Sequence, residues 1–176
     1  MGNREMAEKL NDYFVSVFTE EDTRNLPELE IQGTRENEEL KEISMSKKVV
    51  LEKLMGLKVD KSPGPDILHP RMLKEVAMEI VDALVTIFQN SIDSGVVPAD
   101  WKVANVTPLL KRGGREKTGN YRPVSLTSVV GKMLESILKD VINGHLDNND
   151  LIGHSQHGFM NGKSCLTNLL ESFWIF

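Results

Sequence analysis

One region separates this 176-residue chain from an all-helical protein: Val103-Ala-Asn-Val-Thr-Pro-Leu-Leu110, then the loop Arg112-Gly-Gly-Arg-Glu-Lys-Thr-Gly-Asn120, then Arg122-Pro-Val-Ser-Leu-Thr127. The two outer segments are rich in apolar and β-branched residues, as strands are. A glycine-containing loop between two such segments is typical of a β-hairpin. Because proline cannot donate a ladder hydrogen bond, Pro108 places the first strand at a sheet edge or at the end of the strand.

Apolar residues at helical spacing predict helices on both sides of this hairpin. A first helix is expected over 5–18, with Leu10, Phe14, Val17 and Phe18 facing inward. A short helix capped by Ser46 has the inward residues Val50, Leu54 and Leu57, and a long helix from His69-Pro70 to Gly95 has Leu73, Val76, Ala77, Ile80, Leu84, Ile87 and Phe88. A helix capped by Ser128 runs to about His145, with Met133, Leu134, Ile137, Leu138 and Val141 facing inward. A last helix starts near Ser164, with Cys165 in its apolar face, and Trp101 and Trp174 are expected to be packing residues. The fold class expected is α+β, mostly helical.

Composition narrows the class of protein. Hydrophobic residues make up 40% and charged residues 27%, which predicts a folded chain and excludes intrinsic disorder. No apolar run is long enough to cross a membrane. A single cysteine cannot form an internal disulfide, so a reducing, intracellular setting in cytoplasm or nucleus is expected. Residues 20–42 are acidic and interrupted by Pro27 and Gly33, which divides the chain into an acidic helix and linker over 1–46 and a main domain over 47–176.

Charge is distributed unevenly along the chain. The net charge is −5, yet residues 102–132 hold seven basic side chains against Glu116 alone, a net charge of +6. These are Lys102, Lys111, Arg112, Arg115, Lys117, Arg122 and Lys132. A local basic patch attracts polyanions, and glycines let backbone N–H groups approach phosphate oxygens. Two interpretations remain: a loop that binds phosphate groups, and a solvated loop rich in cations.

Other motifs give weaker signals. His157-Gly-Phe-Met-Asn-Gly-Lys163-Ser164 is similar to a phosphate-binding P-loop, but its glycines enclose three residues instead of four and no strand is predicted before it. An anion-accepting or simply capped helix N-terminus is the alternative interpretation. His154, His157 and Cys165 match no common metal-site spacing. No nucleophile elbow supports a Ser-His-Asp site.

A further set of motifs appears in one order along the chain: Lys61-Ser-Pro-Gly-Pro-Asp66 with His69-Pro-Arg-Met-Leu-Lys74, Val97-Pro-Ala-Asp-Trp-Lys102, Ala104-Asn-Val-Thr-Pro108, Gly119-Asn-Tyr-Arg-Pro-Val-Ser-Leu-Thr-Ser128, and Ser155-Gln-His-Gly-Phe159 with Gly162-Lys-Ser-Cys-Leu-Thr-Asn168. Their order and spacing resemble the reverse transcriptase of non-LTR retrotransposons (LINEs), in particular the chicken repeat 1 type of vertebrates. The resemblance covers nearly the whole chain. It implies that 47–176 is a partial reverse transcriptase domain, the N-terminal extension and fingers of a right-hand polymerase with an incomplete palm.

The resemblance also implies roles for single residues. The family copies RNA into DNA from deoxynucleoside triphosphates (dNTPs) with Mg²⁺. Arg122 matches the arginine that contacts the dNTP phosphates, with Lys111, Arg112 and Arg115 as supporting cations. The residues expected to bind the RNA template or an RNA/DNA hybrid are Gln156, Gly158, Phe159, Lys163, Pro63 and Gly64. One departure bears on the last of these: the family usually has glycine where this chain has Ile67, which puts the positive φ of that loop in doubt.

The catalytic motifs of the family are missing from these 176 residues. Neither Asp-x-x-x-x-Phe-Asp nor aromatic-x-Asp-Asp occurs, so we expect no catalytic residue, no Mg²⁺ bound by this chain, and no polymerase activity of this chain alone. On this interpretation the chain is a fingers fragment that ends before the catalytic aspartates. The alternative of another class is a non-enzymatic helical interaction module, or an inert remnant of a decayed element.

Overall fold

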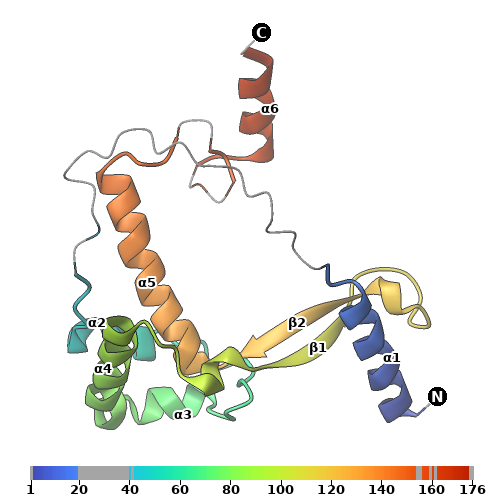
Figure 1. Cartoon of the computed structure of the whole chain (residues 1–176), viewed down its shortest axis with the longest axis horizontal. Coiled ribbons are helices and arrows are strands. Elements are labelled where there is room, and N and C mark those ends of the chain that lie inside the picture. Colours follow the sequence, from blue (N-terminus) through green and yellow to red (C-terminus); the bar gives the residue numbers. More distant parts are fainter. Residues whose placement is uncertain are drawn as a thin grey trace. The chain divides into compact units, whose positions relative to one another are not determined.

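The computed structural model describes residues 2–19, 40, 42–153, 156–158, 160 and 162–174. It contains helices and one two-stranded antiparallel sheet, which confirms the α+β class. Contacts divide the chain into two units, Met1–Gly33 with Ser44–Glu135, and Thr34–Ile43 with Ser136–Phe176. Each unit is described by itself. Helix α5 (Val129–Asn148) begins in the first unit and continues in the second (Figure 1).

The core of the first unit is helical. It is built from α2 (Lys47–Met55), α3 (Pro70–Glu75) and α4 (Ala77–Ser94), and α2 packs along α4. Val50, Leu54, Val81 and Phe88 are completely buried. Trp101, in the 3₁₀ turn η2 (Ala99–Lys102), meets the Phe88 ring edge-on at 5.8 Å between ring centroids, which confirms the prediction that Trp101 is a packing residue.

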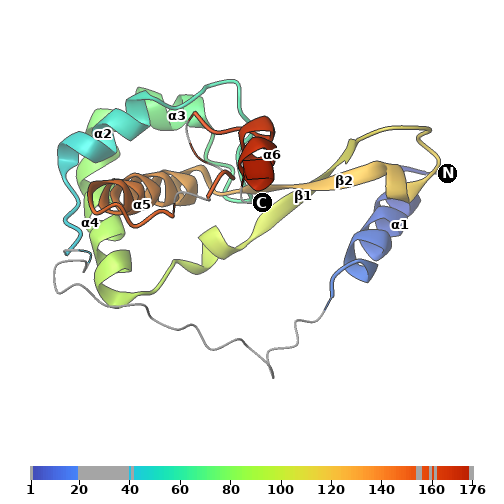
Figure 2. The same ribbon diagram turned by 90° about the horizontal axis from the view of Figure 1, so that it is seen from above.

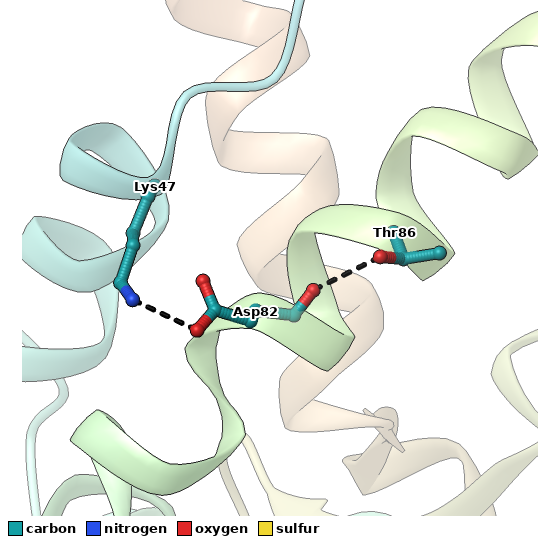
Figure 3. A network of polar contacts seen from close by, with 3 residues as sticks. All are labelled: Lys47, Asp82 and Thr86. Atoms are coloured by element: carbon teal, nitrogen blue, oxygen red, sulfur yellow. Dashed lines mark hydrogen bonds and ion pairs between the residues drawn. The ribbon is translucent and has the colours of Figure 1, made fainter.

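Polar contacts set the start of α2 against α4. Ser46 caps α2 as predicted, since its hydroxyl accepts a hydrogen bond of 3.2 Å from the Val49 N–H. Lys47 Nζ lies 2.8 Å from Asp82 Oδ2, and the Thr86 hydroxyl donates to the carbonyl oxygen of Asp82 at 3.0 Å (Figure 3). The ion pair is exposed to solvent, so it contributes less than about 1 kcal/mol. Apolar burial between α2 and α4 therefore supplies most of the stability here.

The long helix predicted from His69 to Gly95 is interrupted. Val76 has φ −99° and ψ 20° and separates α3 from α4. Beyond this break the inward face consists of Ala77, Val81, Leu84, Phe88 and Ser91, so the predicted inward positions Val76 and Ile87 are wrong, being 38% and 42% exposed. Both ends are as predicted: Pro70 occupies the first turn of α3, and Gly95 ends α4 with φ 66°.

The predicted hairpin is present. Strands β1 (Ala104–Leu110) and β2 (Tyr121–Thr127) pair antiparallel, from Ala104 opposite Thr127 to Leu110 opposite Tyr121, and Pro108 faces Pro123. The Lys111 N–H donates to the carbonyl oxygen of Asn120 at 2.7 Å. Because hydrogen-bonded and non-bonded pairs alternate along such a ladder, the two prolines form a non-bonded pair and no ladder hydrogen bond is lost. In a two-stranded sheet both strands are edges, as the prediction for Pro108 required.

Helix α1 (Asn3–Ser16) packs against the loop end of the hairpin, where the turn η3 (Thr118–Asn120) lies. Figure 1 and Figure 2 both show α1 beside that end of β1 and β2. Leu10 and Phe14 are buried as predicted. Val17 and Phe18 lie beyond the end of the helix and are exposed, so their predicted inward orientation is wrong.

Helix α5 starts where the sequence places it. The Ser128 hydroxyl accepts a hydrogen bond from the Gly131 N–H at 3.2 Å, and Met133, Leu134 and Ile137 are buried. Leu138 and Val141, also predicted inward, are half-buried. The helix ends at Asn148, three residues beyond the predicted end at His145.

Helix α6 (Cys165–Trp174) in the second unit begins one residue after Ser164, as predicted. Cys165 is exposed, so its predicted place in a core is wrong, and Leu166, Leu169 and Phe173 are exposed with it. Periodicity identifies the apolar face of a helix but not whether another element covers it. Among the described residues, no helix is long and apolar enough to cross a membrane.

Candidate nucleic-acid interface

The basic loop of the hairpin is held in shape by the two residues that follow it. The Asn120 amide donates to the carbonyl oxygen of Gly114 at 2.7 Å, and the Tyr121 hydroxyl donates to that of Arg115 at 3.2 Å. Gly113 has φ 74°, a conformation that favours glycine. A Cβ there would lie 2.7 Å from the Asn120 amide nitrogen, so it would displace the Asn120 side chain from its hydrogen bond. Neither Asn120 nor Tyr121 was predicted to be a site residue. The sequence feature that could have identified them is an amide and a phenol side chain at the end of a glycine-rich loop.

Lys111 and Arg122 share one face of the hairpin. Arg122 on β2 lies opposite Leu109 on β1, and Lys111 comes two residues after Leu109. Side chains alternate between faces, so these two cations are diagonal neighbours, with Cβ atoms about 7 Å apart in such a geometry. That spacing lets both side chains reach a single phosphate group or two successive phosphates. The structure therefore brings together two of the four predicted phosphate ligands.

No acidic group neutralises these cations within the part of the chain that the structure describes. Lys111, Arg112 and Arg122 are exposed, and none of them forms an ion pair or a side-chain hydrogen bond there. Glu116, the acidic residue of the loop, folds its carboxylate against Gly114. The positive charge on this face is therefore available to an external anion.

Arg115, the fourth predicted phosphate ligand, is not brought together with Lys111 and Arg122. It lines a pocket between the loop and α1, together with Tyr121. The side chains of adjacent strand residues point to opposite faces, so those of Tyr121 and Arg122 lie on opposite sides of the hairpin. The loop thus presents cations on two different sides.

The predicted template-contacting loop at Pro63 and Gly64 forms the base of the hairpin. Gly64 is buried, and a Cβ there would lie 2.6 Å from the carbonyl group of Thr127 and 2.7 Å from the Ser128 nitrogen. Because Gly64 has no side chain, the loop at Pro63 and Gly64 can contact the backbone between β2 and α5 directly. Pro63 is half-buried beside it.

The same loop keeps a positive φ without a glycine. The Ile67 N–H donates to the carbonyl oxygen of Gly64 at 3.1 Å, which closes a turn, and the Leu68 N–H donates to Asp66 Oδ1 at 3.2 Å. Ile67 has φ 60°, a conformation that β-branched residues rarely adopt. The loop thus has a positive φ at a residue that lacks the freedom of glycine, and Ile67 is strained.

The remaining predicted nucleic-acid ligands belong to the second unit. The Gln156 amide donates to the carbonyl oxygen of Gly158 at 2.9 Å, so it orders its own loop. Lys163 is half-buried and lines a small pocket with Asp147 and Asp150. Phe159 lies outside the described residues.

The P-loop interpretation gains no support from this region. The described residues of 149–164 include no strand before α6. Ser164 and Thr167 cap the helix reciprocally: the Thr167 N–H donates to the Ser164 hydroxyl at 3.2 Å, and the Ser164 N–H donates to the Thr167 hydroxyl at 2.8 Å. This geometry is that of a capped helix N-terminus.

The described residues offer no metal centre. No three His, Cys, Asp or Glu side chains among them are arranged to hold a metal ion. The described residues therefore offer no ligand set for the Mg²⁺ that the resemblance implies, and no chemical step is derived through Mg²⁺.

The chain is similar in sequence to proteins of retrotransposons. No protein-family model matches the chain. It is 32% identical over 109 residues to the Retrovirus-related Pol polyprotein from type-1 retrotransposable element R1 of Bradysia coprophila, over 61% of this chain and 11% of that protein. It is 30% identical over 104 residues to the RNA-directed DNA polymerase from mobile element jockey of Drosophila melanogaster, over 58% of this chain and 11% of that protein. It is also 28% identical over 116 residues to the probable RNA-directed DNA polymerase from transposon BS of the same species, over 65% of this chain and 13% of that protein. The chain thus spans about a tenth of the length of these relatives.

Proposed function

We propose that this chain, which is similar in sequence to the RNA-directed DNA polymerases of non-LTR retrotransposons, forms part of the fingers of such a right-hand polymerase. In this role its basic hairpin binds the phosphates of the incoming dNTP. The observation that carries the proposal is the pair Lys111 and Arg122, which are diagonal neighbours on one exposed face and free of acidic partners among the described residues. Fixed cations of this kind stabilise the charge of transferring phosphates.

The hairpin is suited to this task because the backbone that carries its cations is held in place. Asn120 and Tyr121 fix the loop from one side, and Gly64 anchors the base of β2. Arg112 lies next to Lys111 in the chain and adds a third cation at the mouth of the loop. A loop whose backbone is already ordered binds an anion with less loss of conformational entropy.

Template contact is the second part of the proposal. It assigns the RNA strand to the loop at Pro63 and to the segment from Gln156 to Lys163. Such contact is made to backbone phosphates and stacked bases and tolerates any sequence. The catalytic carboxylates and the Mg²⁺ ions belong to other parts of a complete polymerase, and this chain contributes binding and positioning.

Cations attract any phosphate, so Lys111 and Arg122 also contact the backbone of a single-stranded RNA when no dNTP is present. Binding of a labelled single-stranded RNA, measured by anisotropy at several salt concentrations, therefore tests the proposal. The double variant Lys111→Glu/Arg122→Glu should bind more weakly, and its plot of log affinity against log salt should be shallower by about 1.4, because each phosphate contact on a single strand contributes about 0.7 to that slope. An unlabelled dNTP should displace the RNA from the unaltered chain and fail to do so from the double variant.

Arg71→Glu/Lys74→Glu is the matched control, because both residues lie on α3, away from the hairpin, and the charge change is the same. It should leave affinity and salt slope within twofold of the unaltered chain. Equal losses in the two double variants, or binding that does not depend on salt, would refute the proposal.

One observation favours a second function, that of a helical interaction module. Leu166, Leu169, Leu170 and Phe173 are exposed together on α6. An exposed apolar face of this kind marks a surface that another chain or segment covers. Such a module is indifferent to charge reversal at Lys111 and Arg122, so the same pair of variants separates the two functions.

A further inference from the structure

A pocket of about 270 Å³ lies between α1 and the basic loop of the hairpin. One wall is formed by Met6, Lys9 and Leu10 of α1, and the other by Arg115, Glu116 and Tyr121 of the hairpin. Both walls belong to the first unit, and α1 contacts the turn η3 directly. The pocket opens on the side of the hairpin opposite to Arg122, so it is separate from the phosphate site described above.

The apolar part of this pocket suits a flat ring. Leu10 is buried, Met6 is partly exposed, and Tyr121 is half-buried with its hydroxyl donating to the carbonyl oxygen of Arg115 at 3.2 Å. That hydrogen bond fixes the orientation of the phenol ring. A fixed aromatic ring beside a flexible thioether is a surface on which a planar, polarizable group stacks.

The charged part of the pocket suits an anion beside that ring. Lys9 and Arg115 are both cationic, and Lys9 is paired with Glu5 at 3.2 Å across one turn of α1. Arg115 has no ion pair among the residues that the structure describes. Glu116, which also lines the pocket, can accept a hydrogen bond from the exocyclic amino group of a base.

We propose that this pocket binds a nucleotide, with the base between Tyr121, Met6 and Leu10 and the phosphate at Arg115. The base then stacks on the apolar wall, the phosphate meets Arg115, and an amino group on the base meets Glu116. A simpler anion, such as inorganic phosphate, contacts Arg115 alone. At about 270 Å³ the pocket is slightly smaller than ordinary ligand sites, which begin at about 300 Å³, so it holds one nucleotide unit and not a longer ligand. That unit is a free nucleotide or the phosphorylated end of a strand.

Occupation of the pocket has a structural consequence for the hairpin. A nucleotide there contacts α1 and the loop at once, so it restrains the loop that carries Lys111 and Arg112 on its other side. Binding in the pocket does not depend on the proposed function of Lys111 and Arg122, because no residue is shared between the two sites.

Isothermal titration of the full chain with AMP tests the inference. AMP should bind more tightly than adenosine, which lacks the anion, and more tightly than inorganic phosphate, which lacks the ring. Arg115→Gln should weaken AMP binding about tenfold, the effect of one lost charge-assisted hydrogen bond. Arg71→Gln on α3 is the matched control and should change the affinity less than twofold.

A second variant keeps the test independent of Arg115. Met6→Glu places a negative charge on the opposite wall and should abolish AMP binding while α1 still forms, because Met6 is partly exposed and glutamate is a good helix former. Circular dichroism verifies the helix content. A 5′-phosphorylated oligonucleotide that binds through Arg115 more tightly than AMP assigns the site to a strand end, and a weaker one assigns it to the free nucleotide.

Three results would overturn the inference. The first is no AMP binding at millimolar concentration, and the second is phosphate or adenosine binding as tightly as AMP. The third is an AMP affinity lost in Arg122→Gln but kept in Arg115→Gln, which assigns the nucleotide to the opposite face. Failure of the proposed function is a different result, because it shows as an unchanged salt slope in Lys111→Glu/Arg122→Glu.

Discussion

Replacing Ile67 by glycine should stabilise the protein, which is unusual for the loss of a large apolar side chain. Ile67 has φ 60° and is 79% exposed. A non-glycine residue in the left-handed region costs about 1–3 kcal/mol, and a β-branched residue lies in the upper part of that range, at about 2 kcal/mol. Glycine adopts this conformation without that cost.

Two losses reduce the gain. Glycine makes the unfolded chain more flexible, which costs about 0.4–1 kcal/mol. About a fifth of the Ile67 side chain is buried, and the lost burial costs about 0.3–0.6 kcal/mol if a fully buried isoleucine contributes about 1.5–3 kcal/mol. The net expectation for Ile67→Gly is therefore a gain of about 1 kcal/mol. Ile67→Asn should gain a similar amount, because asparagine tolerates positive φ.

Urea unfolding followed by circular dichroism measures this gain. With a denaturant slope of about 1–3 kcal/mol/M, a gain of about 1 kcal/mol raises the midpoint by roughly 0.5 M. Val96→Gly is the matched control: Val96 is 62% exposed, β-branched, outside regular structure and not in the left-handed region. It should lose about 1–2 kcal/mol, because it gains flexibility in the unfolded chain and loses the burial of about two fifths of the valine. If Ile67→Gly lowers the midpoint as far as Val96→Gly does, Ile67 is not strained and the reasoning fails.

Two further predictions concern how the first unit is held together. Gly64→Ala should lower the free energy of unfolding by about 2–3 kcal/mol in urea titrations, because the new methyl group meets backbone atoms of Thr127 and Ser128 that cannot turn away. Gly144→Ala is the control, because Gly144 lies inside α5, toward its C-terminal end, with open space around it; it should raise the free energy of unfolding by about 0.5–1 kcal/mol. Equal effects at the two glycines would contradict the close approach at Gly64. Ser128→Ala should lower the free energy of unfolding by about 1–2 kcal/mol in thermal or urea unfolding, because it leaves the buried Gly131 N–H without its hydrogen-bond acceptor. Ser128→Thr keeps the hydroxyl and should recover most of that loss. If it recovers none, the cap is not the cause.

Local patterns in the sequence predicted the elements of this fold well. The caps at Ser46 and Ser128, the glycine that ends α4 and the hairpin are all where the sequence places them. Each of these features depends on residues within a few positions of one another. A side chain that caps a helix, or a glycine that permits positive φ, acts locally, so the sequence carries the whole cause.

Errors occurred where the cause lies elsewhere in the chain. The apolar pattern runs unbroken through Val76, yet the helix breaks there. The inward face beyond the break keeps the predicted Phe88, which packs against Trp101, and includes Val81, which was not predicted. Cys165 was expected in a core because its helix face is apolar, and it is exposed. In both cases periodicity identified the apolar residues but could not tell which partner they meet.

The candidate site shows the same division. Charge counting found the basic loop, and the resemblance selected Arg122 and Lys111, which the hairpin register places on one face. No local pattern indicates that Arg115 lines a pocket with α1, because about a hundred residues separate the two walls. Long-range contacts of this kind follow from packing and are not encoded in any short motif.

The two prolines of the hairpin explain why it depends on those long-range contacts. Pro108 and Pro123 lie opposite each other in a non-bonded pair, so the backbone nitrogens at both outer edges lack a hydrogen atom at the same level of the ladder. A third strand can therefore pair fully with neither edge, and an isolated two-stranded hairpin is marginally stable. Its stability must come from its ends: Gly64 against the Thr127–Ser128 backbone at the base, and α1 against η3 at the loop. The position of Arg122 is thus set by residues about 60 and 110 positions earlier in the chain.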